Sequence, residues 1–203
     1  MNYSQLCQDI DVISFYKYKT GGYFVDIGAN DGIKFSNTFL LETKYNWKGI
    51  CAETDPRVFN FCKKNRINSI CTNKAVYKES NIKLKFNLSE NSLLSGLTDF
   101  VDCHTFSLQN SQEIVVDTIS LTDLLNLSNA PSFIEYLTID TEGSELEILK
   151  GCDFNKYSFG TIHIEHNFQE PRRTEMRLLL EKNGYKFLKE NKWDDYYVLK
   201  TLV

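Results

Sequence analysis

The chain of 203 residues lacks the patterns of several specialised protein classes. It has no run of about 18 apolar residues that could cross a membrane, and its first ten residues, MNYSQLCQDI, show neither the basic nor the apolar region of a signal peptide. None of its six cysteines forms a C-x-x-C pair, so neither a zinc ribbon nor a thioredoxin-type site is indicated. We therefore expect a cytoplasmic protein with reduced thiols and no membrane partner.

A strong excess of positive charge is also absent. Lysine and arginine number 23 against 27 acidic residues, a formal net charge of -4, so no broad grip on nucleic acid is indicated. Lysines do gather at Lys74, Lys78, Lys83 and Lys85, a pattern more typical of a solvated strand face than of a binding patch. With only three prolines and no repeat or flexible linker, the sequence predicts a single domain over residues 1–203.

The first half of the chain alternates between helical and strand patterns. Apolar residues at helical spacing predict an N-terminal helix within residues 1–20, from Ser4 to Lys19. The segments YFVDI, WKGICAE and NSICT then read as buried strands, and they are separated by helices that Ser36 and Asp55 can cap. This order predicts a parallel sheet with helices on both faces.

The second half repeats that order after an interruption. NIKLKFNL alternates as an exposed strand should, and residues 87–112 then form a predicted long loop rich in serine and asparagine, which we expect to shape a substrate site. The later segments EIVVDTIS, FIEYLTID and GTIHIEH are predicted strands. YKFLKE and WDDYYVLKTLV are separated by a turn too short for a crossover helix, so they must pair antiparallel. The predicted fold class is α/β, with a mostly parallel sheet that ends in an antiparallel C-terminal hairpin.

The most informative segment is DIGANDG, which follows the first predicted strand. In open α/β sheets ligands bind beyond the carboxyl ends of the strands. The segment lacks the G-x-G-x-x-G pattern of dinucleotide sites, because Asn30 stands where the middle glycine would be. Gly28 removes a Cβ that would keep a ligand from the backbone, and Gly32 permits a positive φ. Asp26 and Asp31 would repel a diphosphate but suit a ligand with an ammonium and a sulfonium group, such as S-adenosylmethionine (SAM).

An acidic residue supports this interpretation from the next strand. Glu53 ends the second predicted strand, 21 residues after Gly32, close to the distance at which nucleoside-binding α/β folds place a carboxylate on the ribose hydroxyls. The predicted cofactor site is completed by the remaining residues of the loop and by side chains from later strand ends: Ala29, Asn37, Asn73, Ala75 and Asp140.

Four segments together resemble the FkbM-type family of SAM-dependent methyltransferases: FVDIGANDGIKFSNTFLLE, GICAETDP, IDTEGSELEILKG and IEHN. The resemblance runs over nearly the whole chain. It implies a class I methyltransferase fold of seven strands, the last antiparallel, and O-methylation of a hydroxyl, often on a sugar or a polyketide. One departure is Lys74, which stands where the family tends to have valine.

Two motifs on the predicted ligand edge could carry the chemistry. His166 is a natural general base, since histidine titrates near neutral pH, and Asp140 and Glu142 could orient it or the acceptor. Alternatively, Mg²⁺ could bind the set Asp140, Glu165, His166 and Asn167, although a histidine suits this hard cation less well than oxygen ligands.

Two classes of function follow from these observations. The first is an active O-methyltransferase for a sugar, glycan or other small molecule, and the second is a binding or scaffold module that kept the fold and lost turnover. The presence of both the loop and a candidate base favours the enzyme. A nicotinamide-dependent oxidoreductase is disfavoured by the missing glycines.

Overall fold

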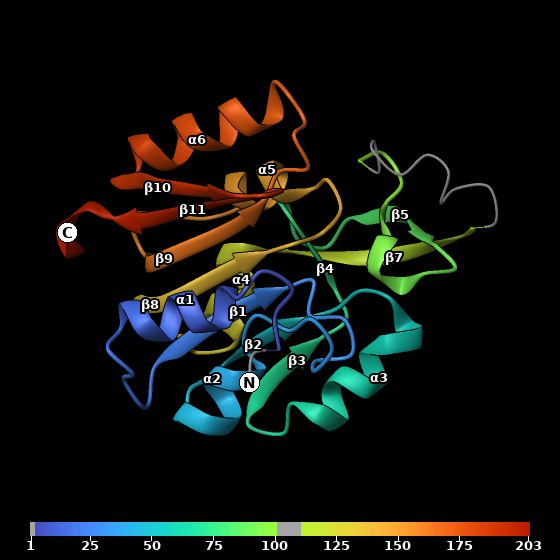
Figure 1. Ribbon diagram of the computed structural model, residues 1–203. Coiled ribbons are helices and arrows are strands. Elements are labelled where there is room, and N and C mark those ends of the chain that lie inside the picture. Colours follow the sequence, from blue (N-terminus) through green and yellow to red (C-terminus); the bar gives the residue numbers. More distant parts are fainter. Residues whose placement is uncertain (1–2, 101–110) are drawn as a thin grey trace.

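The computed structural model describes residues 3–100 and 111–203. Its centre is a seven-stranded sheet of order β10-β11-β9-β8-β1-β2-β3 (Figure 1). The strands are β1 (Tyr23–Ile27), β2 (Lys48–Ala52), β3 (Ser69–Thr72), β8 (Phe133–Ile139), β9 (Ser158–Glu165), β10 (Tyr185–Asn191) and β11 (Asp194–Leu199).

The first five of these strands by position in the chain run parallel, and the last two form an antiparallel pair. β1 pairs in parallel with both β2 and β8, while β2 and β8 pair in parallel with β3 and β9. β11 is antiparallel to both β9 and β10. The predicted fold class and the antiparallel C-terminal hairpin are therefore confirmed.

Helices cover both faces of this sheet because its central strands are apolar on both sides. On one face, Val25 and Ile27 pack in a core cluster with residues of α4 (Leu121–Leu127), α5 (Glu145–Lys150) and α6 (Arg172–Lys182). On the other face, Phe24 packs with residues of α1 (Gln8–Phe15), α2 (Phe39–Tyr45) and α3 (Pro56–Asn65). Asp55 caps α3 as predicted, accepting a hydrogen bond from the backbone N–H of Arg57. No helix among the described residues is long and apolar enough to span a membrane.

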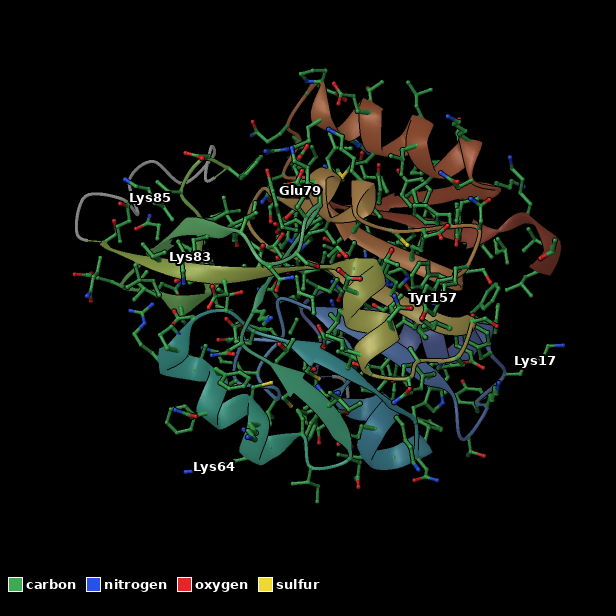
Figure 2. The ribbon with its side chains drawn as sticks, turned by 180° about the vertical axis from the view of Figure 1, so that it is seen from behind. Lys17, Lys64, Glu79, Lys83, Lys85 and Tyr157 are labelled. Carbon is green, nitrogen blue, oxygen red and sulfur yellow. The ribbon has the colours of Figure 1, made fainter. Side chains whose placement is uncertain are left out.

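A small second sheet extends from one end of the main sheet (Figure 1). Its strands have the order β4-β7-β5-β6 and comprise β4 (Ala75–Tyr77), β5 (Lys83–Leu88), β6 (Gly96–Leu97) and β7 (Gln112–Ser120). Lys83 and Lys85 project from this sheet (Figure 2) and pair with Asp117 and Glu113 of the neighbouring strand. The two lysines therefore lie on an exposed strand face, where each is balanced by an acid.

Three predicted boundaries need correction. The N-terminal helix is shorter than residues 4–19, because α1 begins only at Gln8 and ends at Phe15. Ser36 is not the residue that precedes α2, although its Oγ accepts hydrogen bonds from the N–H groups of Thr38 and Phe39. The predicted loop of residues 87–112 begins inside β5, ends inside β7, and contains a 3₁₀ turn, η1 (Ser92–Leu94), and β6; its residues 101–110 lie outside the described residues.

Candidate functional site

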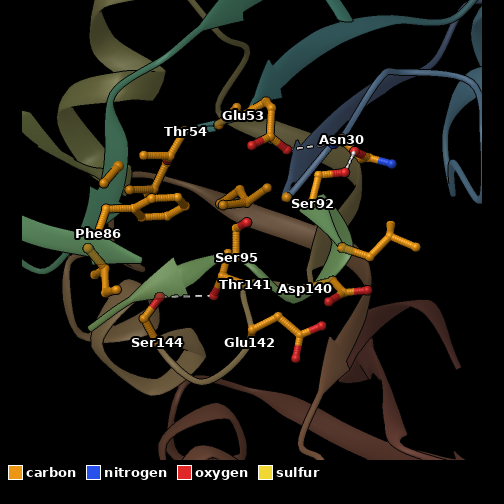
Figure 3. A pocket seen from close by; sticks show the side chains of 17 residues that line it. Asn30, Glu53, Thr54, Phe86, Ser92, Ser95, Asp140, Thr141, Glu142 and Ser144 are labelled. Atoms are coloured by element: carbon orange, nitrogen blue, oxygen red, sulfur yellow. Dashed lines mark hydrogen bonds between the residues drawn. The ribbon is translucent and has the colours of Figure 1, made fainter. Parts of the chain in front are cut away.

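Two adjoining cavities lie at the carboxyl ends of β1, β2 and β8. The first has an empty volume of about 630 Å³, part of which is open to solvent, and Figure 3 shows the side chains that line it. The second is smaller, about 440 Å³. Both are lined by Gly28, Asn30, Leu93 and Asp140. The carboxyl edge of the sheet therefore offers one continuous site of two compartments.

Gly28 and Gly32 set the backbone of the loop after β1. Gly28 has a φ of +95°, and a Cβ added there would lie 1.7 Å from the carbonyl oxygen of Asp140. The close approach of β8, rather than of a ligand as predicted, requires this glycine. Gly32 has the predicted positive φ, +81°, and faces the Arg66 side chain. Asp31 stabilises the following turn, because its Oδ1 accepts hydrogen bonds of 2.8 Å from the N–H groups of Ile33 and Lys34.

The negative charge of Asp26 is balanced inside the protein. Its Oδ2 accepts a 2.5 Å hydrogen bond from Thr38 Oγ1 and lies 3.8 Å from Nη1 of the buried Arg66. The same guanidinium donates from Nε to Glu42. Asp26 lines the second cavity, but the sequence-based argument overestimated the free charge there. Arg66 follows the end of α3 in a segment without any sign of a site, so nothing in the sequence pointed to it.

Glu53 is presented to the first cavity by two backbone hydrogen bonds. Its Oε2 accepts from the N–H of Asn30 and its Oε1 from the N–H of Asp55, both at 2.7 Å. Burial raises the pKa of Glu53 to about 7 against the opposing effect of these two bonds, with smaller contributions from the charges of Asp55 and Asp26. The carboxylate is thus fixed in orientation before any ligand arrives.

The other predicted cofactor residues are divided between the cavities and the surface. Asn37 and Ala29 line the second cavity, and Ala75 lines the first. Asn37 Nδ2 donates to Thr138 Oγ1, whereas its buried Oδ1 has no hydrogen-bond partner among the described residues. Asn73 is exposed and lines neither cavity.

One side of the first cavity is formed by part of the segment 87–112, which the sequence analysis treated as a substrate loop. Ser92, Leu93, Ser95 and Leu97 line it, together with Phe86 of β5 (Figure 3). Two hydrogen bonds tie this segment to the sheet edge: Ser92 Oγ donates to Asn30 Oδ1, and Ser95 Oγ donates to Asp55 Oδ2. The alternation in NIKLKFNL was the signal for β5, but no pattern indicated that the chain would fold back over the cofactor loop.

Three acidic side chains converge where the cavities meet the end of β9. Carboxylate oxygens of Asp140, Glu142 and Glu165, here called the cavity-side group, lie within 4.8 Å of one another. Burial, and then the negative charges of neighbouring acids, raise the pKa of Asp140 and of Glu165; burial and the charge of Glu145 raise the pKa of Glu142 to about 8. A hydrogen bond between Asp140 and Glu165 offsets part of this effect on Asp140. The group concentrates negative charge beside both cavities.

Glu145 holds the turn that follows β8. Its Oε1 accepts hydrogen bonds from the N–H groups of Thr141 and Gly143 and from Thr141 Oγ1. This carboxylate closes the turn between β8 and α5, and it thereby fixes the positions of Asp140 and Glu142.

His166 lies apart from the cavities, contrary to what a general base would require. It is buried, and its Nδ1 accepts a 3.0 Å hydrogen bond from the N–H of Phe168. Its Nε2 faces Asp195 Oδ1 at 3.5 Å. Burial lowers the pKa of His166, and Asp195 opposes this. Neither His166 nor Asn167 lines the two cavities. His166 is not in the group of ligand atoms that contains Asp140 and Glu165, so the predicted metal set of Asp140, Glu165, His166 and Asn167 does not assemble as one group.

His166 belongs instead to a second acidic cluster. Ligand atoms of His166, Glu190 and Asp195, here called the hairpin-side group, also lie within 4.8 Å of one another. Arg173 crosses this group, donating from Nη2 to Asp195 Oδ1 at 2.6 Å and to Glu190 Oε2 at 2.5 Å. A guanidinium therefore occupies the position where a cation would otherwise balance the two acids.

The order and directions of the strands are those of the class I SAM-dependent methyltransferase fold, and solved structures agree. The METTL16 MTase domain matches with a TM-score of 0.52 and 13% identity, over 94% of this chain and 63% of that domain. Precorrin-6y C5,15-methyltransferase from Geobacter metallireducens matches with a TM-score of 0.52 and 13% identity, over 94% and 85% of the two chains. The human methyltransferase 10 domain containing protein matches with a TM-score of 0.50 and 12% identity, over 95% and 80%. At these identities the likeness concerns the fold, and the chain spans less than two thirds of the METTL16 domain.

The sequence assigns the family within this class. Residues 26–187 match the Methyltransferase FkbM domain family, so the chain belongs to that family of SAM-dependent methyltransferases. The predicted family is confirmed. No curated protein gives a significant match to the sequence.

Proposed function

We propose that the protein transfers the methyl group of SAM to a hydroxyl group of a sugar, a glycan or another small molecule. The observation that carries the proposal is the continuous two-compartment site at the carboxyl edge of the sheet, with the fixed carboxylate of Glu53 facing one compartment and the unpartnered Oδ1 of Asn37 lining the other.

The lining residues fit the two ends of SAM. In the first cavity Glu53 would accept hydrogen bonds from both ribose hydroxyls, and Ala75 and Phe86 would pack against the adenine. In the second cavity the buried Asn37 Oδ1 would accept from the ammonium group of the methionine part, so that an acceptor now unsatisfied gains a charged donor. Asp140 lines both cavities, so its carboxylate would lie near the sulfonium that joins the two ends.

When bound, SAM supplies an electrophilic methyl carbon. Transfer forms an oxygen–carbon bond as the sulfur–carbon bond breaks with its electron pair left on sulfur, and the hydroxyl proton leaves the acceptor. The task of the chain is alignment of the two centres and placement of that proton. Asp140 and Glu142 would hold the acceptor hydroxyl by accepting its hydrogen bond. We propose no base role for His166, because it lies away from the cavities.

The charge of the site limits the acceptor. Asp140, Glu142 and Glu53 all line the first cavity, and the ionised form of each would repel an anionic acceptor. A neutral polyol such as a sugar meets carboxylates as hydrogen-bond acceptors instead. The net charge of -4 likewise favours a small molecule over nucleic acid, and a cytoplasmic location remains our prediction from the thiols.

Cofactor choice is tested first by thermal shift with SAM, S-adenosylhomocysteine and NAD⁺, of which only the first two should stabilise the protein. Calorimetry then tests the placement. Charge-assisted hydrogen bonds contribute about 1.5–3 kcal/mol each, so Glu53→Ala should weaken SAM binding at least tenfold. Glu113→Ala, which removes an exposed acid of β7, is the matched control and should bind as wild type. Unchanged affinity in a folded Glu53→Ala protein would refute the placement, and stabilisation by NAD⁺ alone would refute the function.

A further inference from the structure

We propose that the cavity-side group of Asp140, Glu142 and Glu165 binds one divalent cation of the kind that prefers oxygen ligands, such as Mg²⁺, Mn²⁺ or Ca²⁺. The catalytic use of this ion rests on the proposed function, whereas its binding does not.

The geometry of the group suits a single ion. One oxygen from each of the three carboxylates lies within 4.8 Å of the other two. Oxygen ligands lie about 2.0–2.6 Å from Mg²⁺ or Ca²⁺, so ligands on opposite sides of one ion are separated by at most about twice that distance. The three oxygens can therefore coordinate a common ion with only small side-chain adjustments. The set contains carboxylates alone, which hard cations favour over mixed sets with nitrogen or sulfur.

A carboxylate oxygen of Glu165 that lacks a hydrogen-bond partner is a second, independent observation in favour of a cation site. Glu165 is 6% exposed, and its Oε2 has no hydrogen-bond partner within residues 3–100 and 111–203. A buried carboxylate oxygen without a partner is costly, because it has lost its hydration and gained nothing in return. A cation held between Glu165, Asp140 and Glu142 would satisfy that oxygen.

The charges around the cavity-side group also favour a bound cation. The groups that act most strongly on both Asp140 and Glu165 through their charge are Glu142, Glu145 and Asp194, and all three are acids; Asp140 acts on Glu165 in the same way. The hairpin-side group shows the alternative solution, since Arg173 there bridges Asp195 and Glu190 at 2.5–2.6 Å. A guanidinium of the chain thus bridges two acids of the hairpin-side group, whereas the cavity-side group lies beside a ligand cavity.

The position of the group gives the ion a use. Asp140 and Glu142 line the first cavity (Figure 3), and Glu165 closes the group from the end of β9. A cation there would lie beside the acceptor hydroxyl, where its positive charge lowers the pKa of an oxygen that it binds and so favours loss of the hydroxyl proton.

Titration of the SAM-free, EDTA-treated and desalted protein with MnCl₂ tests the binding, with the free Mn²⁺ followed by electron paramagnetic resonance. We expect one Mn²⁺ per chain, competition by Mg²⁺ or Ca²⁺, and at least tenfold weaker binding in both Glu165→Gln and Glu142→Gln. Glu190→Gln removes an acid from the hairpin-side group and should bind Mn²⁺ as wild type does. Melting curves of each variant establish that it is folded.

Three results would overturn the inference: no stoichiometric Mn²⁺ binding by the wild type, unchanged binding in folded Glu165→Gln, or a loss in Glu190→Gln as large as that in Glu165→Gln. SAM calorimetry on the same EDTA-treated protein separates this failure from that of the proposed function. SAM binding without Mn²⁺ binding would refute only the proposed metal site. Mn²⁺ binding without SAM binding would leave the metal site standing and refute the proposed transfer.

Discussion

The cavity-side group and the hairpin-side group are both acidic, and both form where β9 ends. They differ in what balances their charge. Asp195, 1% exposed, is held by Arg173 and approached by Arg177 at 3.4 Å, while burial and the charges of neighbouring acids raise the pKa of Asp140 and of Glu165. A buried acid paired with an arginine is typical of a structural ion pair, whereas buried acids with raised pKa values at a cavity are typical of a binding or catalytic site. The comparison can be tested by removing charge from either side.

The largest effect should come from removing the arginine of the hairpin-side group. Arg173→Met leaves Asp195 buried beside Glu190 without its main partner, and loss of one partner of a buried ion pair costs about 3 kcal/mol or more. We expect the free energy of unfolding in urea to fall by about this amount. Lys189→Met, which breaks an exposed pair with Asp11, is the control and should change stability little. Equal stability of the Arg173 variant and the wild type would contradict the structural role of the group.

The next effect sharpens the assignment of His166. His166→Ala removes the acceptor of the Phe168 N–H bond and leaves a small buried space, which together should lower the free energy of unfolding by about 2 kcal/mol. Because the imidazole does not line either cavity, SAM affinity and kcat per folded molecule should stay near wild type. A fall in kcat of about 10²-fold or more in folded protein would instead restore the histidine as a general base.

A third acid, Glu53, differs from both groups because backbone N–H groups hold it. Its pKa of about 7 means that the ionised fraction falls from about nine-tenths at pH 8 to one-tenth at pH 6. Ribose hydroxyls donate to the ionised form, so we expect SAM affinity to fall about tenfold between these pH values. The free energy of unfolding changes with pH in the opposite direction to SAM affinity. The raised pKa of Glu53 stabilises the folded state at low pH, and this contribution is lost as the pH rises towards 7. Calorimetry across pH checks the first trend, and Glu53→Gln should remove this component of the slope; a slope unchanged in that variant would exclude Glu53 as its origin.

The smallest effect is a gain in stability. Glu165→Gln keeps the shape of the side chain but removes a buried acid whose pKa is raised by burial and by the charges of Asp140 and Glu142, so without divalent cations the variant should be about 1 kcal/mol more stable than wild type. The paired experiment is Asp195→Asn in the hairpin-side group. Loss of the negative charge leaves Arg173 without its buried partner, and the free energy of unfolding should fall. Destabilisation of the same size in both variants would show that the two groups do not differ in the way described.

The fold could be predicted because its signals are local. Val25 and Ile50 sit in short apolar strands followed by capped helices, and that order alone specifies a parallel sheet. The position of Glu53 at the first cavity could be predicted because its distance from Gly32 along the chain reflects one strand–helix–strand unit. His166 could not be placed, since the direction of a side chain after a strand depends on the hairpin that packs beside it. Arg66 and Ser92 were missed because they meet the loop from distant segments.

The parallel pairing of β4 with β7 brings Tyr77 opposite Ser120. The N–H of Asn81 also donates to the carbonyl of Thr118. The two ends of the segment that carries β5, β6 and most of β7 therefore lie side by side at residues 81 and 118. In engineering terms this segment is an exchangeable cassette, because its two ends can be joined to another segment without altering the order of the seven central strands. Since Phe86 and Ser92 of the segment line the first cavity, such an exchange would change what the site accepts while leaving Glu53 in place.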